Sequence, residues 1–81
     1  MSLHSHEFVE TYQGLVGFGM NRETNENTIV YYLQKFSDDS LMNVIKQRFS
    51  DQELEDLFES LSGLLQKHLS ESEYHTLFLK E

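Results

Sequence analysis

The chain has 81 residues, with 14 Asp and Glu against 6 Lys and Arg, which gives a formal charge of −8. This length allows one small domain with one modest core. The sequence contains no cysteine, which excludes disulfide scaffolds and thiolate metal sites. The acidic balance disfavours binding to nucleic acid or to an anionic membrane, because both need clustered basic side chains.

No segment of the sequence is apolar for long enough to cross a bilayer. The longest nearly apolar run, residues 15–20, contains two glycines and falls far short of the roughly 20 residues that a spanning helix needs. The chain also does not open with a basic and then apolar signal segment. We therefore expect a cytoplasmic protein with a single helical domain, residues 1–81, in which residues 1–5 are a mobile tail.

The first half of the chain predicts two helices with a polar connection between them. Apolar side chains share one helical face over residues 5–16, and Gly17 is placed to end that helix in the left-handed conformation. Residues 21–27 contain no apolar side chain and predict a connection. Residues 28–36 have strand-like composition, but a lone strand would lack a partner, so we predict a helix there. The apolar face of that helix is formed by Ile29, Tyr32, Leu33 and Phe36.

Three serines followed by acidic residues predict helix starts in the second half. A serine at the N-cap accepts a hydrogen bond from a backbone amide, and the acids suit the positive end of the helix dipole. These serines are Ser37, Ser50 and Ser70, and Glu53 and Glu73 complete a capping box after the last two. The helices that follow are expected over residues 38–48, from residue 51 to about residue 69, and from residue 71 onward.

The helix that begins after Ser50 carries a stripe of large apolar side chains at helical spacing. Together with the other elements it predicts an all-α fold, a compact irregular bundle of about five short helices in a single domain. Such a small domain has a thin margin of stability, which self-association would increase. The stripe contains Leu54, Leu57, Phe58, Leu61, Leu64, Leu65 and Leu69.

Five acids crowd the start of that helix, more than capping requires. They are either a solvated face that favours solubility or a docking patch for a basic partner. Tyr31 lies away from the apolar face of its own helix and is the candidate aromatic contact. As docking charges we take Asp51, Glu55, Asp56 and Glu59.

No catalytic or cofactor-binding motif is present, and we expect no enzymatic activity and no cofactor. The sequence instead predicts a module that binds another protein, or a second copy of itself as a homodimer. One alternative is a metal-binding or proton-transfer site formed by His68, Glu71 and His75, of which Glu71 and His75 are spaced i, i+4. The more ordinary interpretation of His68 is a partly covered histidine at the margin of the core. Another alternative is an acidic mimic of nucleic acid that occupies the basic groove of a DNA-binding protein.

Overall fold

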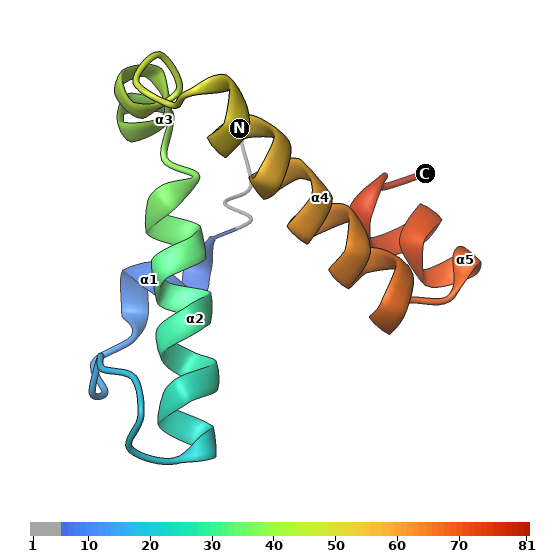
Figure 1. Ribbon diagram of the computed structural model, residues 1–81. Coiled ribbons are helices and arrows are strands. Elements are labelled where there is room, and N and C mark those ends of the chain that lie inside the picture. The colour runs from blue at the N-terminus through green and yellow to red at the C-terminus, as the bar shows by residue number, and fades with distance from the viewer. Residues whose placement is uncertain (1–5) are drawn as a thin grey trace. The chain divides into compact units, whose positions relative to one another are not determined.

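The computed structural model describes residues 6–81, so the tail predicted over residues 1–5 lies outside the described residues. Residues 6–81 form helices, turns and loops without any strand (Figure 1), and the predicted all-α fold class is confirmed. The chain divides into two compact units, Met1–Gln47 and Arg48–Glu81. Over the same residues 6–81, no helix combines the length and the apolar character that crossing a membrane requires.

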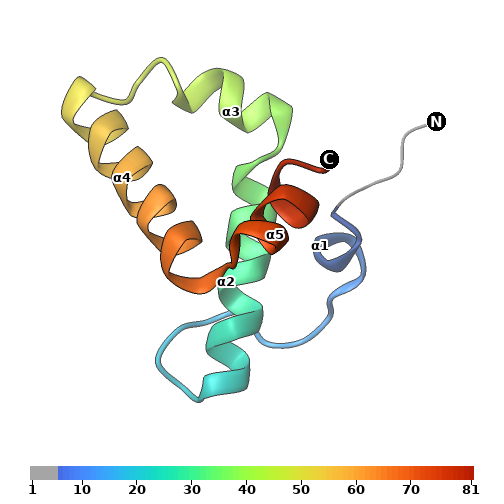
Figure 2. The ribbon, with the colours of Figure 1, turned by 90° about the vertical axis from the view of Figure 1, so that its right-hand side faces the viewer.

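The first unit contains α1 (Glu7–Thr11), α2 (Arg22–Phe36) and α3 (Asp39–Ile45). In both Figure 1 and Figure 2, α1 lies beside α2, which is the long helix of this unit. The helix predicted over residues 28–36 is confirmed, although α2 begins six residues earlier than expected.

The polar connection predicted over residues 21–27 is wrong, because these residues form the cap and first turns of α2. Asn21 is the N-cap, and its side-chain oxygen accepts a hydrogen bond from the amide of Thr24 at 2.8 Å. Across the first turn of the helix, Arg22 Nε lies 2.6 Å from Glu26 Oε2. A good cap and an i, i+4 ion pair together allow this polar segment to be helical.

α1 is shorter than predicted and ends at Thr11 instead of near residue 16. The backbone becomes extended at Tyr12, with φ −70° and ψ 126°. The ring of Tyr12 stacks on Phe8, with 4.7 Å between the ring centroids, and its hydroxyl donates to the carbonyl of Leu15 at 2.8 Å. These contacts hold the chain where it leaves α1, before it reaches the first glycine, Gly14.

Polar side chains of α2 hold the segment that joins α1 to α2. The hydroxyl of Thr28 accepts a hydrogen bond from the Gly17 amide at 3.0 Å and donates one to the Gly17 carbonyl at 2.9 Å. The side-chain oxygen of Asn25 accepts from the Gly19 amide at 2.8 Å. Gly19 has the positive φ of this segment, 99°, so the left-handed conformation predicted at Gly17 is wrong.

α2 therefore packs within its unit through polar contacts more than through its apolar face. Gln34 Oε1 accepts a hydrogen bond from the Val9 amide of α1 at 2.9 Å. Thr28 is only 4% exposed and is the one buried residue within residues 6–81, where no apolar side chain is buried. The apolar face predicted for this helix is consequently left in contact with solvent, as the exposure of Ile29, Tyr32 and Leu33 shows.

The N-cap of α3 lies one residue later than predicted. Asp38 is the N-cap and accepts from the Leu41 amide at 3.2 Å, while Ser37 ends α2 and donates to the Gln34 carbonyl at 3.0 Å. The helix ends at Ile45, three residues before the predicted end. Ser37, Asp38 and Asp39 are all residue types that favour the N-cap, and in the structure Asp38 is the N-cap.

The second unit contains α4 (Asp51–His68), α5 (Glu71–Glu73) and a π-helical turn, η1 (Tyr74–Phe78). Both predicted capping boxes are confirmed. Ser50 and Ser70 accept from the amides of Glu53 and Glu73 at 3.1 Å, and the two glutamates accept in return from the serine amides at 2.9 and 2.8 Å. The caps place the start of α4 at the residue expected from the sequence.

Replacing Thr28 with valine tests the role of its hydroxyl, because valine has nearly the same shape and makes neither bond to Gly17. We expect a loss of roughly 1–3 kcal/mol in the free energy of unfolding, since two partly buried backbone groups lose their partner. Urea denaturation measures this loss. The control is Thr11→Val, which removes an exposed hydroxyl bond to the Glu7 carbonyl and should change stability by less than about 0.5 kcal/mol. Equal stability of the two variants would contradict this role of Thr28.

Candidate functional site

The longest helix of the chain, α4, presents an uncovered row of apolar side chains. With about 100° of rotation per residue, they fall on one side of the helix. Phe58 is 71% exposed and Leu61 is 47% exposed, and the others are exposed or half-buried. We call this row the α4 stripe, and it consists of Leu54, Leu57, Phe58, Leu61, Leu64 and Leu65. The sequence predicted these six residues correctly, whereas Leu69, also predicted in the row, is the C-cap of α4 and has extended backbone. In this unit no helix packs over the whole length of the stripe.

A groove of about 620 Å³ follows the C-terminal half of the α4 stripe. Its walls are mainly apolar and come from α4 and from η1, where the rings of Tyr74 and Phe78 stack with 5.3 Å between their centroids. The i, i+4 spacing of these two aromatics is the sequence signal for this wall. α4 contributes Phe58, Leu61, Leu64 and Leu65 to the lining.

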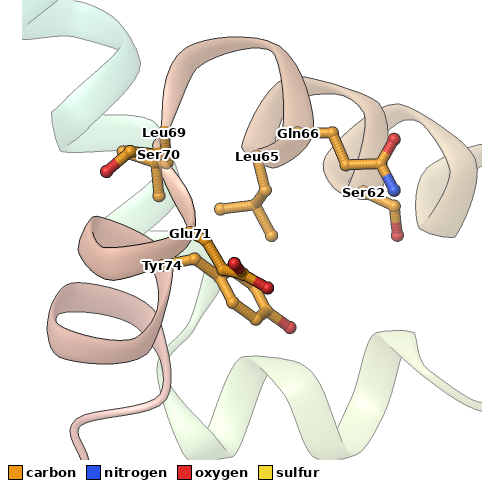
Figure 3. Close-up of a pocket in the computed structure, with 7 residues that line it drawn as sticks. All are labelled: Ser62, Leu65, Gln66, Leu69, Ser70, Glu71 and Tyr74. Atoms are coloured by element: carbon orange, nitrogen blue, oxygen red, sulfur yellow. The ribbon is translucent and has the colours of Figure 1, made fainter.

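A second hollow, of about 430 Å³, lies beside the groove at the junction of α4 and α5 and is more polar. Figure 3 shows the side chains of Leu65 and Tyr74 directed into the same space. Gln66 of α4 and Glu71 of α5 line it with polar groups. An apolar floor with a polar rim is typical of surfaces that bind other proteins.

The four predicted docking charges do not occupy equivalent positions around α4. The helical rotation places Asp51 beside Phe58 at one edge of the α4 stripe, and it places Glu55 further round on the same flank of the helix. Asp56 and Glu59 lie on the far side, where Asp56 accepts a hydrogen bond from Gln52 Nε2 at 2.8 Å. A ligand seated on the stripe would therefore meet the first pair and not the second.

Tyr31, the predicted aromatic contact, is half-buried inside the first unit. Its ring lies 6.2 Å from that of Tyr12, measured between centroids, and the ammonium group of Lys35 lies 5.6 Å from its centroid. Tyr31 therefore helps to attach the end of α1 to α2. The most exposed aromatic of this helix is its neighbour Tyr32, which is 61% exposed.

The candidate metal or proton-transfer residues are not brought together. His68 lines the groove and is exposed, so the partly covered position expected for it is wrong. His75 Nδ1 lies 2.7 Å from Glu81 Oε1, while Glu71 lies at the polar rim. Within residues 6–81, no three His, Asp or Glu side chains are grouped so that they could hold a metal ion.

Comparison with known proteins finds no family model, no curated protein and no solved structure that matches this chain. The geometry of the two units is therefore the basis for a functional proposal. Its most distinctive feature is the α4 stripe with two acids on one flank of the helix.

The capping box at the start of α4 stabilises the first turn of this helix, which carries Asp51. Replacing Ser50 with alanine removes the side-chain acceptor for the Glu53 amide, and we expect the free energy of unfolding to fall by about 1 kcal/mol. Circular dichroism during urea denaturation measures the change. The control is Ser60→Ala in the exposed middle of α4, where alanine is the better helix former and should not destabilise. Equal losses in both variants would contradict the capping role.

Proposed function

We propose that this chain is a non-catalytic, cytoplasmic protein-binding module in which α4 receives a basic amphipathic helix of a partner protein. The observation that carries the proposal is the exposure of the α4 stripe along the helix, next to an apolar groove. An apolar face of this extent on a helix is typical of helix-in-groove recognition. The 18 residues of α4 span about 27 Å, enough for five turns of a partner helix.

Charge supports the choice of a basic partner. α4 contains five acids and one lysine, and two of its acids, Asp51 and Glu55, lie on the flank of the helix next to Phe58. Lysine or arginine residues that flank an apolar seam on a partner helix would meet these carboxylates. Such contacts contribute mainly to orientation and to the rate of association, while burial of the seam contributes most of the affinity.

An acidic mimic of nucleic acid would use the same carboxylates but has no need for an apolar seam. A mimic binds through charge, so its complex weakens steeply as salt screens the carboxylates. The α4 stripe favours a helix as the ligand, because burial of leucine and phenylalanine side chains does not depend on ionic strength in this way.

The direct test uses an 18-residue peptide with leucine at i, i+3, i+4 and i+7 positions and lysine elsewhere. Isothermal titration calorimetry with the full chain should show saturable binding at one site. A scrambled peptide of the same composition is the control for charge alone. Equal affinity for the two peptides would overturn the proposal of helix recognition and would favour an acidic surface that binds any cation.

Leu61 lies in the middle of the α4 stripe and also lines the groove. In Leu61→Asp a carboxylate would be covered by the bound peptide without a partner, which is costly. We expect affinity for the amphipathic peptide to fall at least 100-fold in calorimetry, with an unchanged circular dichroism spectrum because Leu61 is exposed in the free chain. Retained affinity would exclude the stripe as the binding surface.

The two pairs of acids allow a matched comparison of charge. We expect Asp51→Lys with Glu55→Lys to weaken peptide binding about tenfold, because two attractions become repulsions at the edge of the seam. Asp56→Lys with Glu59→Lys changes the net charge equally but on the far side of α4, and should weaken binding about twofold or less. Equal effects of the two double variants would show that only net charge matters.

A further inference from the structure

The hollow of about 430 Å³ at the junction of α4 and α5 combines apolar walls with a carboxylate. Leu65, Leu69 and the ring of Tyr74 form the walls, and Figure 3 shows Leu65 and Tyr74 directed into the space between them. Glu71 contributes the carboxylate and Gln66 an amide, and none of the described residues that line the hollow is basic. The lining therefore suits a side chain that is apolar along its length and cationic at its end.

The walls of the hollow are the best covered part of the second unit. Within residues 48–81, five residues are half-buried and the others are exposed. Four of these five line the hollow, namely Ser62, Leu65, Leu69 and Tyr74. The capping box of Ser70 and Glu73 holds the turn that carries Glu71 and Tyr74. A ligand consequently enters a hollow whose walls are already in place, so little free energy is lost in ordering them.

The hollow lies on the acidic flank of α4. With about 100° of rotation per residue, Ser62 and Gln66 fall on the same flank of the helix as Asp51 and Glu55. Gln66 stands about 16 Å beyond Glu55 along the helix axis, at about 1.5 Å per residue. A partner helix whose basic edge meets the two acids of α4 therefore has the hollow further along the same edge.

We propose that the hollow is the anchor site for one arginine side chain of the partner helix. This inference rests on the proposed function and names the residue that the partner carries at one end of its basic edge. The aliphatic stem of the arginine lies against Leu65 and Leu69, and its guanidinium group stacks on the ring of Tyr74. The same group donates two hydrogen bonds to the carboxylate of Glu71, which shares one side of its helical turn with Tyr74 at i, i+3 spacing.

The lining favours arginine over lysine. A guanidinium group is planar and stacks on an aromatic ring, whereas an ammonium group is a compact charge. Arginine has five N–H donors, so two bonds to Glu71 leave donors for the side-chain oxygen of Gln66. The guanidinium group is also less strongly hydrated, so it loses less on entering a hollow with apolar walls.

The first experiment uses variants of the 18-residue leucine and lysine peptide in which one lysine at a time is replaced with arginine. In calorimetry with the full chain, we expect one position to raise affinity about fivefold. This gain should disappear in Glu71→Gln. It should remain in Asp56→Asn, which removes one charge on the far side of α4 and keeps an acceptor for Gln52.

The results separate this inference from the proposed function. If the lysine peptide binds but no position prefers arginine, the anchor site is wrong and helix recognition stands. The anchor site is also wrong if Glu71→Gln keeps the preference for arginine. Circular dichroism should be unchanged in Glu71→Gln, because the side chain is exposed and belongs to neither capping box.

A second experiment tests the hollow without a partner helix. We titrate the isotope-labelled full chain with Nα-acetyl-arginine amide and follow the backbone amides by nuclear magnetic resonance. The shifts should be largest at Leu65, Gln66, Glu71 and Tyr74. Nα-acetyl-citrulline amide has nearly the same shape without the charge and should leave these amides unshifted. Equal shifts with the two probes, or arginine shifts spread evenly over all the acidic residues, would overturn the inference even if the peptides bind.

Discussion

The first unit depends on one hydroxyl group. Thr28 is the buried residue among residues 6–47, and its hydroxyl both accepts from the amide of Gly17 and donates to the carbonyl of Gly17. A backbone segment that leaves water must find partners for its amides and carbonyls, and here α2 supplies them from its side chains. One turn earlier in α2, the side-chain oxygen of Asn25 accepts a hydrogen bond from the Gly19 amide. The joining segment is thus held by polar side chains of α2 and not by a buried apolar residue.

This constraint explains why α2 faces outward with its large apolar residues. A helix has a limited circumference, and the positions turned toward α1 and the joining segment carry hydrogen-bonding side chains that only those neighbours can satisfy. Turning the helix to bury Tyr32 and Leu33 would leave Thr28 and Gln34 without their backbone partners, at a cost similar to the gain from burial. Hydrogen bonds require a defined distance and direction, whereas apolar contacts do not. The hydrogen bonds of Thr28 and Gln34 therefore determine how α2 is rotated about its axis.

The sequence predicted best those features that depend on neighbours within a few residues. Both capping boxes, at Ser50 and Ser70, and the α4 stripe follow from local spacing, and the structure confirms them. The predicted start of α2 is wrong because residues 21–27 contain no apolar side chain, so periodicity gives no helical signal there, whereas Asn21 caps the helix. The role of Tyr31 could not be predicted, since the contact with Tyr12 depends on where α1 ends. Likewise, periodicity identified the apolar side of α2 with Ile29, Tyr32 and Leu33, but it gave no indication that these side chains would be exposed.

The exposed apolar side chains of α2 and of α4 differ in the charge around them. No charged residue stands over residues 27–34 of α2, and the two bases of this helix balance its two acids. α4 concentrates five acids in its first nine residues, which discourages a second copy and attracts a cationic ligand. Apolar surface alone would let any exposed helix pair with any other. The uneven distribution of acids between α2 and α4 therefore makes α4 the helix at which the charge of a ligand matters most.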